Sequence, residues 1–241
     1  PAPGEDHYDR SSHSGTVIAM SARHVSALPA AAVAEPERKV GRPRRFDPAT
    51  EVEMICDAAL ALMQRGDHDL TVTDILAEAG MSTRSFYRHF TSKDELLCAL
   101  YRRDATRAAA RLEAKVAAAP TPIAALEAWV NEIVSFGLNE AKAKRVAALG
   151  SMQVMKAEGI EAEALLGAEL IASPLVAILR AGNADGSFLA ADPEPDAEFI
   201  RAITWAAAGL SHGGVTPGRP KAQAVDDVLG FCRRALGCPP T

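Results

Sequence analysis

The sequence has few aromatic residues, and the alternation of polar and apolar residues that marks β-strands is hard to find in it. Aromatic residues make up 5% of the 241 positions, whereas hydrophobic residues of all kinds make up 48%. Apolar residues recur instead at helical spacing in an alanine-rich chain, which predicts an all-α protein. A chain of this length can bury a sizeable core as one large or two modest domains.

Cysteine is also scarce, and its placement excludes the common metal and disulfide frameworks. The four cysteines, Cys56, Cys98, Cys232 and Cys238, are scattered, and none forms a zinc-type pair with partner histidines. We therefore expect reduced, structural thiols in a cytoplasmic protein that holds neither a metal nor another cofactor.

The sequence shows no Ser-His-Asp arrangement and no Gly-rich phosphate loop. Asp192, Glu194 and Asp196 cluster in the region of His212, but acids at the amino end of a helix are explained by capping and by the helix dipole. We therefore expect that the protein is not an enzyme.

An excess of positive charge is likewise missing, because 26 basic residues stand against 31 acidic ones, for a formal net charge of −5. This balance excludes a protein coated in positive charge. A nucleic-acid surface, if present, must be local.

The stretch Leu70–Lys93 predicts two short helices joined by a tight turn. Apolar residues recur at helical spacing from Val72 to Ala79, and Thr71 with Asp74 is a capping-box variant at the start. Gly80 then supplies the positive φ that the turn requires.

The second of these helices is predicted to begin at Ser82 and to point Phe86 and Phe90 inward, four residues apart. Its outward face carries no acid and consists of Thr83, Arg84, Ser85, Tyr87, Arg88 and His89. Such hydroxyl, guanidinium and ring groups suit a DNA major groove, where they meet phosphates and base edges.

The run T-V-x-D-I-x-x-E-A-G-M-S-x-x-S-F-Y-x-H-F-x-S-K-D-E-L-L resembles the helix-turn-helix of the TetR (tetracycline-repressor) family of bacterial transcriptional regulators. The resemblance extends from Asp47 to about Leu100. Arg84 departs from the family's frequent glycine and His89 from its frequent tyrosine, so base preference and one phosphate contact are expected to differ. The DNA-contacting set that this resemblance and the outward face predict is Arg42, Arg44, Arg45, Thr71, Thr73, Ser82, Thr83, Arg84, Ser85, Tyr87, Arg88, His89 and Lys93.

Four segments are expected along the chain. Residues 1–37 lack helical or strand periodicity and predict a disordered arm; a faint signal-peptide pattern there is interrupted by Pro29. Residues 38–46 form a basic extension whose Gly-Arg-Pro-Arg core resembles an AT-hook, which enters the minor groove, although a solubilising linker is the alternative. Residues 47–93 are the helix-turn-helix domain, and residues 94–241 are a larger helical domain for ligand binding and dimerisation.

Caps and breakers predict where the remaining helices lie. Asp47 and Pro48 open the first helix, and Ser92 with Glu95 opens the fourth. The others are predicted from Pro122 through Phe136, from Glu140 to Ala157, from Ile160 to Arg180 with Gly182 at its end and Pro174 inside it, from Pro193 to Gly213 and Gly214, and from Lys221 to Leu236.

In the TetR family the last two helices form the dimer interface. By this resemblance we expect an interface of Ile203, Ala207, Leu210, Val225, Val228, Leu229 and Cys232, with packing inside one chain as the alternative. Two chains related by a twofold axis would then read a palindromic operator.

The family also encloses an effector among the helices of the larger domain. The candidates to line this pocket are Trp129, Phe136, Met152, Met155, Leu166, Leu170 and Trp205, each of which could equally be a core residue. Asn131, Gln153 and Lys156 are the polar groups expected nearby. We therefore expect a small, largely apolar effector.

These expectations describe a homodimeric repressor that binds double-stranded operator DNA and leaves it when a small molecule binds. A transcriptional activator of the same fold, and a helical dimeric adaptor without DNA binding, are the alternatives that the sequence leaves open.

Overall fold

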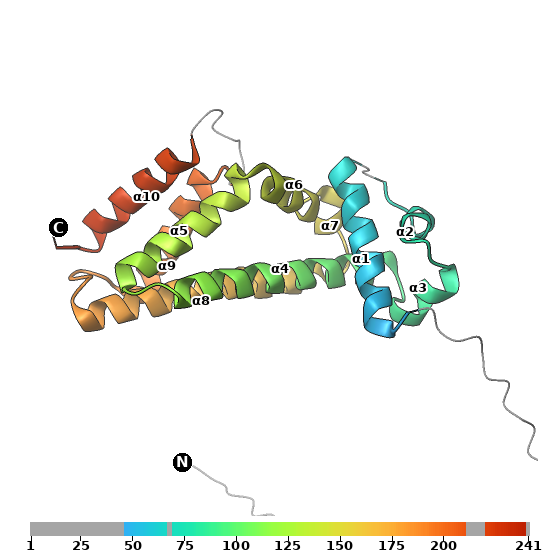
Figure 1. The fold of residues 1–241 in the computed structure, drawn as a ribbon, viewed down its shortest axis with the longest axis horizontal. Helices are drawn as coiled ribbons and strands as arrows, with labels where there is room; N and C mark the ends of the chain where they lie inside the picture. The colour runs from blue at the N-terminus through green and yellow to red at the C-terminus, as the bar shows by residue number, and fades with distance from the viewer. Residues whose placement is uncertain (1–45, 67–68, 211–219, 240–241) are drawn as a thin grey trace, which may run out of the picture. The chain divides into compact units, whose positions relative to one another are not determined.

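The computed structural model describes residues 46–66, 69–210 and 220–239. This part of the chain is helical and contains no strand, as the composition predicts. The elements in chain order are α1 (Pro48–Arg65), α2 (Val72–Ala79), α3 (Thr83–His89), α4 (Lys93–Ala117), α5 (Pro122–Leu138), α6 (Glu140–Leu149), α7 (Met152–Met155), α8 (Ile160–Asp185), α9 (Pro193–Ala207) and α10 (Lys221–Ala235) (Figure 1).

The first helices begin and end where local chemistry predicts. Asp47 Oδ1 accepts hydrogen bonds from the backbone amides of Ala49 and Thr50, at 3.0 and 3.1 Å, and so satisfies two otherwise unpaired donors of α1. The capping box of Thr71 and Asp74 is present at the start of α2. Gly80 ends α2 at φ 63°, in the left-handed region that a side chain disfavours.

A first hydrophobic core joins α1, α2, α3 and the amino-terminal half of α4. Ile55, Ile75, Phe86 and Leu97 are fully buried in it. Burial of a Phe or Ile side chain stabilises a fold by about 1.5–3 kcal/mol. Since α3 is too short to be stable alone, this burial is what keeps it helical.

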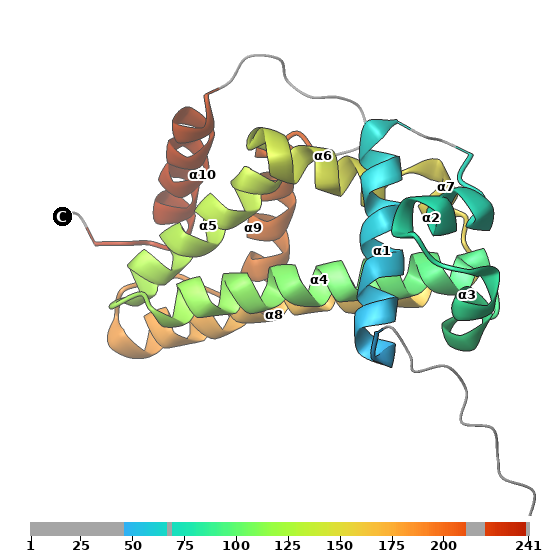
Figure 2. The ribbon, with the colours of Figure 1, turned by 45° about the vertical axis from the view of Figure 1, so that its right-hand side comes forward.

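Helix α4 leaves the first core and continues into a second one. Figures 1 and 2 show α8 lying alongside α4; α5 packs against both, and α9 packs against α8 and α5. Trp129 of α5 is fully buried here and donates its indole N–H to the backbone oxygen of Ile171 at 3.0 Å. Leu112 of α4 belongs to this second core, so one continuous helix supports both halves of the structure.

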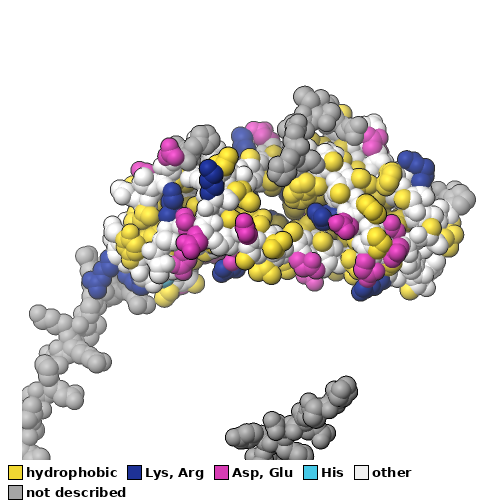
Figure 3. Space-filling model, turned by 180° about the vertical axis from the view of Figure 1, so that it is seen from behind, with side chains coloured by type: hydrophobic (Ala, Val, Ile, Leu, Met, Phe, Trp, Pro, Cys, Tyr) yellow, Lys and Arg dark blue, Asp and Glu magenta, His cyan; other side chains and the backbone are white. Residues whose placement is uncertain are grey.

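Helix α8 is long and apolar enough to cross a membrane by length and composition alone, but it packs along α4. Much of its outer surface is nevertheless apolar and exposed, with Leu165 73% and Leu166 59% accessible. Figure 3 shows hydrophobic side chains gathered on this face of the molecule.

Three helix boundaries differ from the sequence-based prediction. The single helix expected for residues 140–157 is divided, because Gly150 and Ser151 are poor helix formers and the chain turns there before α7. Gly182 does not end α8, which continues to Gly186 at φ 80°. Helix α9 ends at Ala207, well before Gly213 and Gly214, which lie outside the described residues along with the expected arm 1–37.

Gly182 lies inside α8 because the ring of Phe188 packs directly on its Cα. A Cβ placed on Gly182 would lie 1.9 Å from Cδ2 of Phe188, whose side chain is 2% exposed. A side chain at this position would therefore clash with the ring that the loop after α8 brings back.

We predict that Gly182→Ala lowers the free energy of unfolding by about 1–3 kcal/mol, because the buried Phe188 ring must move. Gly230→Ala in α10 is the matched control, since its Cβ would come no closer than 3.6 Å to another atom. That change should stabilise the protein by up to about 1 kcal/mol through helix propensity. Urea unfolding followed by circular dichroism measures both, and equal effects would contradict the packing argument.

Candidate functional site: an exposed α3 face and an enclosed pocket

Helix α3 presents an exposed surface that is held in orientation from below. Phe86 is fully buried, whereas Tyr87 next to it is 61% exposed. The two rings meet edge to face with centroids 5.2 Å apart, so the position of Tyr87 is set by the core. Thr83 and Arg84 are also exposed, and no acid lies on α3.

A buried carboxylate on α1 anchors the end of α3. Glu51 is 5% exposed, and its Oε2 lies 2.7 Å from Nη1 of Arg88 and 2.7 Å from Nε2 of His89. The hydrogen bond from His89, assisted by the charge of Arg88, holds the pKa of Glu51 below its ordinary value.

The sequence-based placement of His89 on the outward face is therefore wrong. Its side chain is 10% exposed and turned toward α1. Arg88 also uses one guanidinium nitrogen, Nη1, in an ion pair with Glu51. Sequence reasoning missed Glu51, because a pairing across 37 or 38 positions leaves no local signal.

Several other predicted DNA-contacting residues already take part in helix capping or in hydrogen bonds to the backbone of another segment. Ser82 accepts a hydrogen bond from the amide of Ser85, and the Thr71 hydroxyl lies 2.6 Å from a carboxylate oxygen of Asp74. Lys93 donates to the backbone oxygen of Leu70 at 3.0 Å. Thr73 is exposed on α2, whereas Arg42, Arg44 and Arg45 lie outside the described residues.

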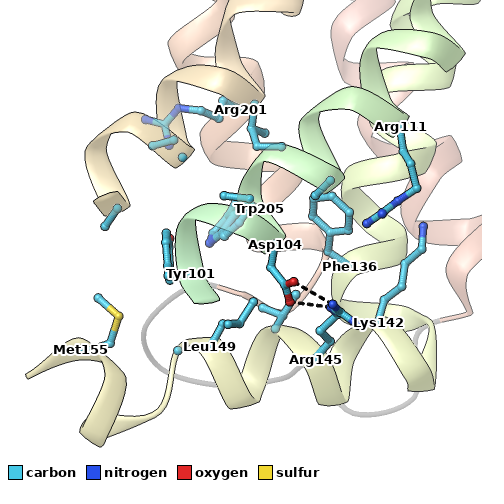
Figure 4. Close-up of a pocket in the computed structure, with 18 residues that line it drawn as sticks. Tyr101, Asp104, Arg111, Phe136, Lys142, Arg145, Leu149, Met155, Arg201 and Trp205 are labelled. Carbon is cyan, nitrogen blue, oxygen red and sulfur yellow. Dashed lines mark hydrogen bonds and ion pairs between the residues drawn. The ribbon is translucent and has the colours of Figure 1, made fainter. Parts of the chain in front are cut away.

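The second feature is a partly open cavity of about 300 Å³ lined by residues of α4, α5, α6, α7, α8 and α9. Figure 4 shows the aromatic side chains of Tyr101, Phe136 and Trp205 around it. The rest of its apolar wall consists of small and aliphatic side chains. A largely apolar cavity with a few convergent polar groups is typical of a small-molecule site.

Three of the seven predicted pocket residues, Phe136, Met155 and Trp205, line this cavity. Trp129 is instead a core residue bonded to α8, because its ring fills the contact between α5 and α8. Met152 and Leu166 lie at the surface, 69% and 59% exposed.

Leu170, the remaining predicted pocket residue, lines a different and more open groove of about 710 Å³ near Pro120. We take the smaller cavity as the candidate site, because it is more enclosed and combines aromatic and charged side chains. The groove is lined mainly by small apolar residues.

The polar wall of the cavity differs from the expected one. None of Asn131, Gln153 and Lys156 lines it. Instead it receives one acid and four cationic side chains, which are Asp104, Arg111, Lys142, Arg145 and Arg201.

Asp104 is the residue that connects these charges to one another. Its carboxylate is 5% exposed and accepts two hydrogen bonds from Arg145, both at 2.7 Å, as Figure 4 shows. Arg103 Nε lies 3.3 Å from the same carboxylate, while Nη1 of Arg103 reaches Glu53 and Asp57 of α1, each at 2.8 Å. A chain of ion pairs therefore connects the cavity to the first helix of the α1–α3 unit.

The residues predicted for a dimer interface divide into two groups. Val225, Val228, Leu229 and Cys232 of α10 are buried in the second core of a single chain, and burial raises the pKa of the Cys232 thiol to about 12. Their expected position at a subunit surface is not what the structure shows, since α10 turns this face onto α5 and α9. Ile203, Ala207 and Leu210 remain partly exposed.

Within the described residues, no group of three His, Cys, Asp or Glu side chains is placed to hold a metal ion. The free thiols Cys56, Cys98 and Cys232 are buried and Cys238 is half-buried.

Residues 55–100 match the model of the tetR family of bacterial regulatory proteins. The chain carries a TetR-family DNA-binding domain. The resemblance read from the sequence is thereby confirmed, and the match is to transcriptional regulators, not to an enzyme family. Comparison with curated protein sequences found no match.

Solved structures share the TetR fold with this chain. A TetR-family regulator of Agrobacterium tumefaciens has 23% identity and a TM-score of 0.57, covering 79% of this chain and 99% of its own. A transcriptional-regulator candidate of Pseudomonas aeruginosa PAO1 has 22% identity and a TM-score of 0.66, covering 80% and 93%. One of Saccharomonospora viridis, solved in complex with choline, has 18% identity and a TM-score of 0.63, covering 77% and 96%.

We predict that Glu51→Gln lowers the free energy of unfolding at neutral pH. The variant should also show a smaller decrease of this free energy than wild type as the pH falls. A carboxylate whose pKa is lowered on folding stabilises the fold above its ordinary pKa, and this contribution disappears as the pH falls through the folded value. The difference in urea midpoint between wild type and variant should therefore shrink from about pH 5 to about pH 3. Glu113→Gln, on the exposed surface of α4, is the control, and a constant difference for Glu51→Gln would refute the assignment.

Proposed function

We propose that this protein is a cytoplasmic, ligand-responsive transcriptional repressor that binds a palindromic operator as a homodimer. The observation that carries the proposal is the acid-free outer face of α3, which the core and Glu51 hold rigidly toward solvent. An activator of the same fold uses the same DNA contacts. A gene-expression comparison with and without the protein distinguishes the two.

The face of α3 offers the groups that DNA recognition uses. Arg84 supplies a guanidinium that can pair with guanine, and Tyr87 and Thr83 supply hydroxyls for phosphates or bases. The basic tract at 38–45 precedes this domain in the sequence, and we propose that it adds minor-groove contacts.

A homodimer supplies the second half-site that one seven-residue helix cannot cover. We place the interface on the outer face of α9, where Phe199, Ile203 and Ala206 recur at helical spacing. Phe199 is 64% exposed, and Phe231 of the neighbouring α10 is 46% exposed. This apolar face replaces the buried α10 residues in the proposed interface.

The cavity lined by α4 to α9 supplies the site for a small-molecule effector. The Saccharomonospora viridis relative holds choline in its crystal, so a protein of this fold can hold a small molecule. If the effector binds the released conformation about a hundredfold better, it supplies about 2.7 kcal/mol toward release from DNA.

We predict that the purified protein selects particular fragments from genomic DNA, and that Arg84→Ala weakens this binding by about 1–3 kcal/mol and relaxes sequence preference. Tyr87→Ala should also weaken it, because a fixed phosphate or base contact is lost. Titrations by fluorescence anisotropy measure both variants. Arg234→Ala on α10 is the control with the same change in net charge; if all three variants bind as wild type does, α3 does not read DNA and the adaptor alternative stands.

We predict that Phe199→Glu converts the dimer to a monomer, because it places a charge in an apolar interface. Light scattering should then report 25.4 kDa instead of twice that mass. Met152→Glu, at a similarly exposed apolar residue of α7, should remain dimeric. A wild-type protein that is itself monomeric would overturn the proposal.

A further inference from the structure

We propose that the cavity binds an amphipathic organic anion, and that its carboxylate competes with Asp104 for Arg145. This inference rests on the proposed function, because it names the effector class of the same site. It replaces the largely apolar effector that the sequence led us to expect.

The first argument is the balance of charge around the cavity. Two of its four cations are already paired, since Arg145 binds Asp104 and Lys142 Nζ lies 2.6 Å from Glu132. Arg111 and Arg201 have no ion-pair partner among the described residues. Figure 4 shows them on different sides of the space. A positively charged ligand would meet these two unpaired cations, whereas an anion would neutralise them.

The second argument is the apolar remainder of the wall, together with the size of the space. Tyr101, Phe136 and Trp205 provide aromatic surface, and the alanines of α4 and α8 provide smooth aliphatic surface. At about 30 Å³ for each water-sized group, a cavity of about 300 Å³ holds about ten non-hydrogen atoms. A carboxylate on a short hydrocarbon chain or a single aromatic ring fits both the size and the polarity.

The third argument is the position of Asp104 between the ligand and α1. A ligand carboxylate that takes Arg145 leaves Asp104 a buried charge with only Arg103 close to it. Nη2 of Arg103 is buried and has no hydrogen-bond partner, so it is available to receive the released carboxylate.

That exchange has a consequence for the DNA-binding unit. When Arg103 turns toward Asp104, its hold on Glu53 and Asp57 of α1 weakens. Arg103 is 10% exposed, whereas Glu53 and Asp57 are 41% and 66% exposed, so the loss of these two pairs shifts the equilibrium by the modest amount expected of partly solvated ion pairs. Ligand binding and the position of α1 are thereby coupled through one arginine.

The first experiment measures ligand class on the full chain by titration calorimetry. The probes are octanoate, octanol and octyltrimethylammonium, which share one hydrocarbon chain and differ in charge. We expect octanoate to bind and the other two to bind at least about tenfold more weakly, since only octanoate can accept charge-assisted hydrogen bonds from the arginines. Equal affinities for octanoate and octanol, or preference for the cation, would overturn the proposal.

Arg111→Ala and Arg201→Ala test the charge argument without removing a buried pair. Each should weaken octanoate binding about tenfold or more and leave octanol binding unchanged. Arg234→Ala is the matched control outside the cavity and should bind octanoate as wild type does. If Arg111→Ala and Arg201→Ala behave like this control, the anion does not lie in this cavity.

The coupling is tested on a DNA fragment that the wild-type protein selects. Octanoate should release that fragment from wild type, whereas Asp104→Asn should bind octanoate and no longer release DNA. Arg103→Lys, which keeps the charge but lacks Nη2, should show weaker release and serves if Asp104→Asn does not fold. Release by octanoate that is unchanged in these variants would refute the coupling.

The two levels of the proposal fail separately. If the chain binds octanoate but selects no DNA fragment, the proposed function is wrong. If it selects DNA but does not bind octanoate, only the proposed effector class is wrong.

Discussion

The contact on which the structure most depends is the buried carboxylate of Asp104 on α4. Arg145 of α6 holds it from one side and Arg103 from the other, and Arg103 in turn holds Glu53 and Asp57 of α1. Removing one partner of a buried pair costs about 3–5 kcal/mol, because it strands the remaining charge. The ion pairs therefore set where α1 and α6 lie on α4, beyond what apolar packing requires.

The same principle operates at the opposite side of α1. Glu51 is nearly as deeply buried as Asp104 and fastens the end of α3 through Arg88 and His89. Helix α1 thus carries carboxylates on two sides, one toward α3 and the others toward α4. A change in the charges around Asp104 acts on the element that supports α3.

Helix α4 connects the surroundings of Asp104 with the core beneath α3, because it is continuous through both cores. Leu97 belongs to the core beneath α3, and Leu112 belongs to the core shared with α5 and α10. A shift at one end of this 25-residue helix would therefore reach the residues packed on it at the other end.

Local chemistry in the sequence was enough to determine the helices and their ends from α1 to α5. Asp47, Thr71 and Gly80 act through hydrogen bonds and dihedral angles within a few residues, and so their effects can be read from spacing. The all-helical class and the TetR-type DNA-binding domain follow from the same short-range patterns. By contrast, Gly182 was misread as a terminator, because its role depends on the ring of Phe188, which the loop after α8 brings back.

Only the tertiary structure decided which polar groups are exposed and which form ion pairs or hydrogen bonds with one another. His89 lies on α3 beside exposed residues, yet a carboxylate 38 positions earlier turns it inward. The same holds for Val225 and Val228, whose apolar face is used within one chain, and for the arginines around the cavity, which come from helices distant in sequence. The physical reason is that burial and charge pairing are properties of surfaces brought together in space, whereas a sequence pattern records only the periodicity of one element at a time.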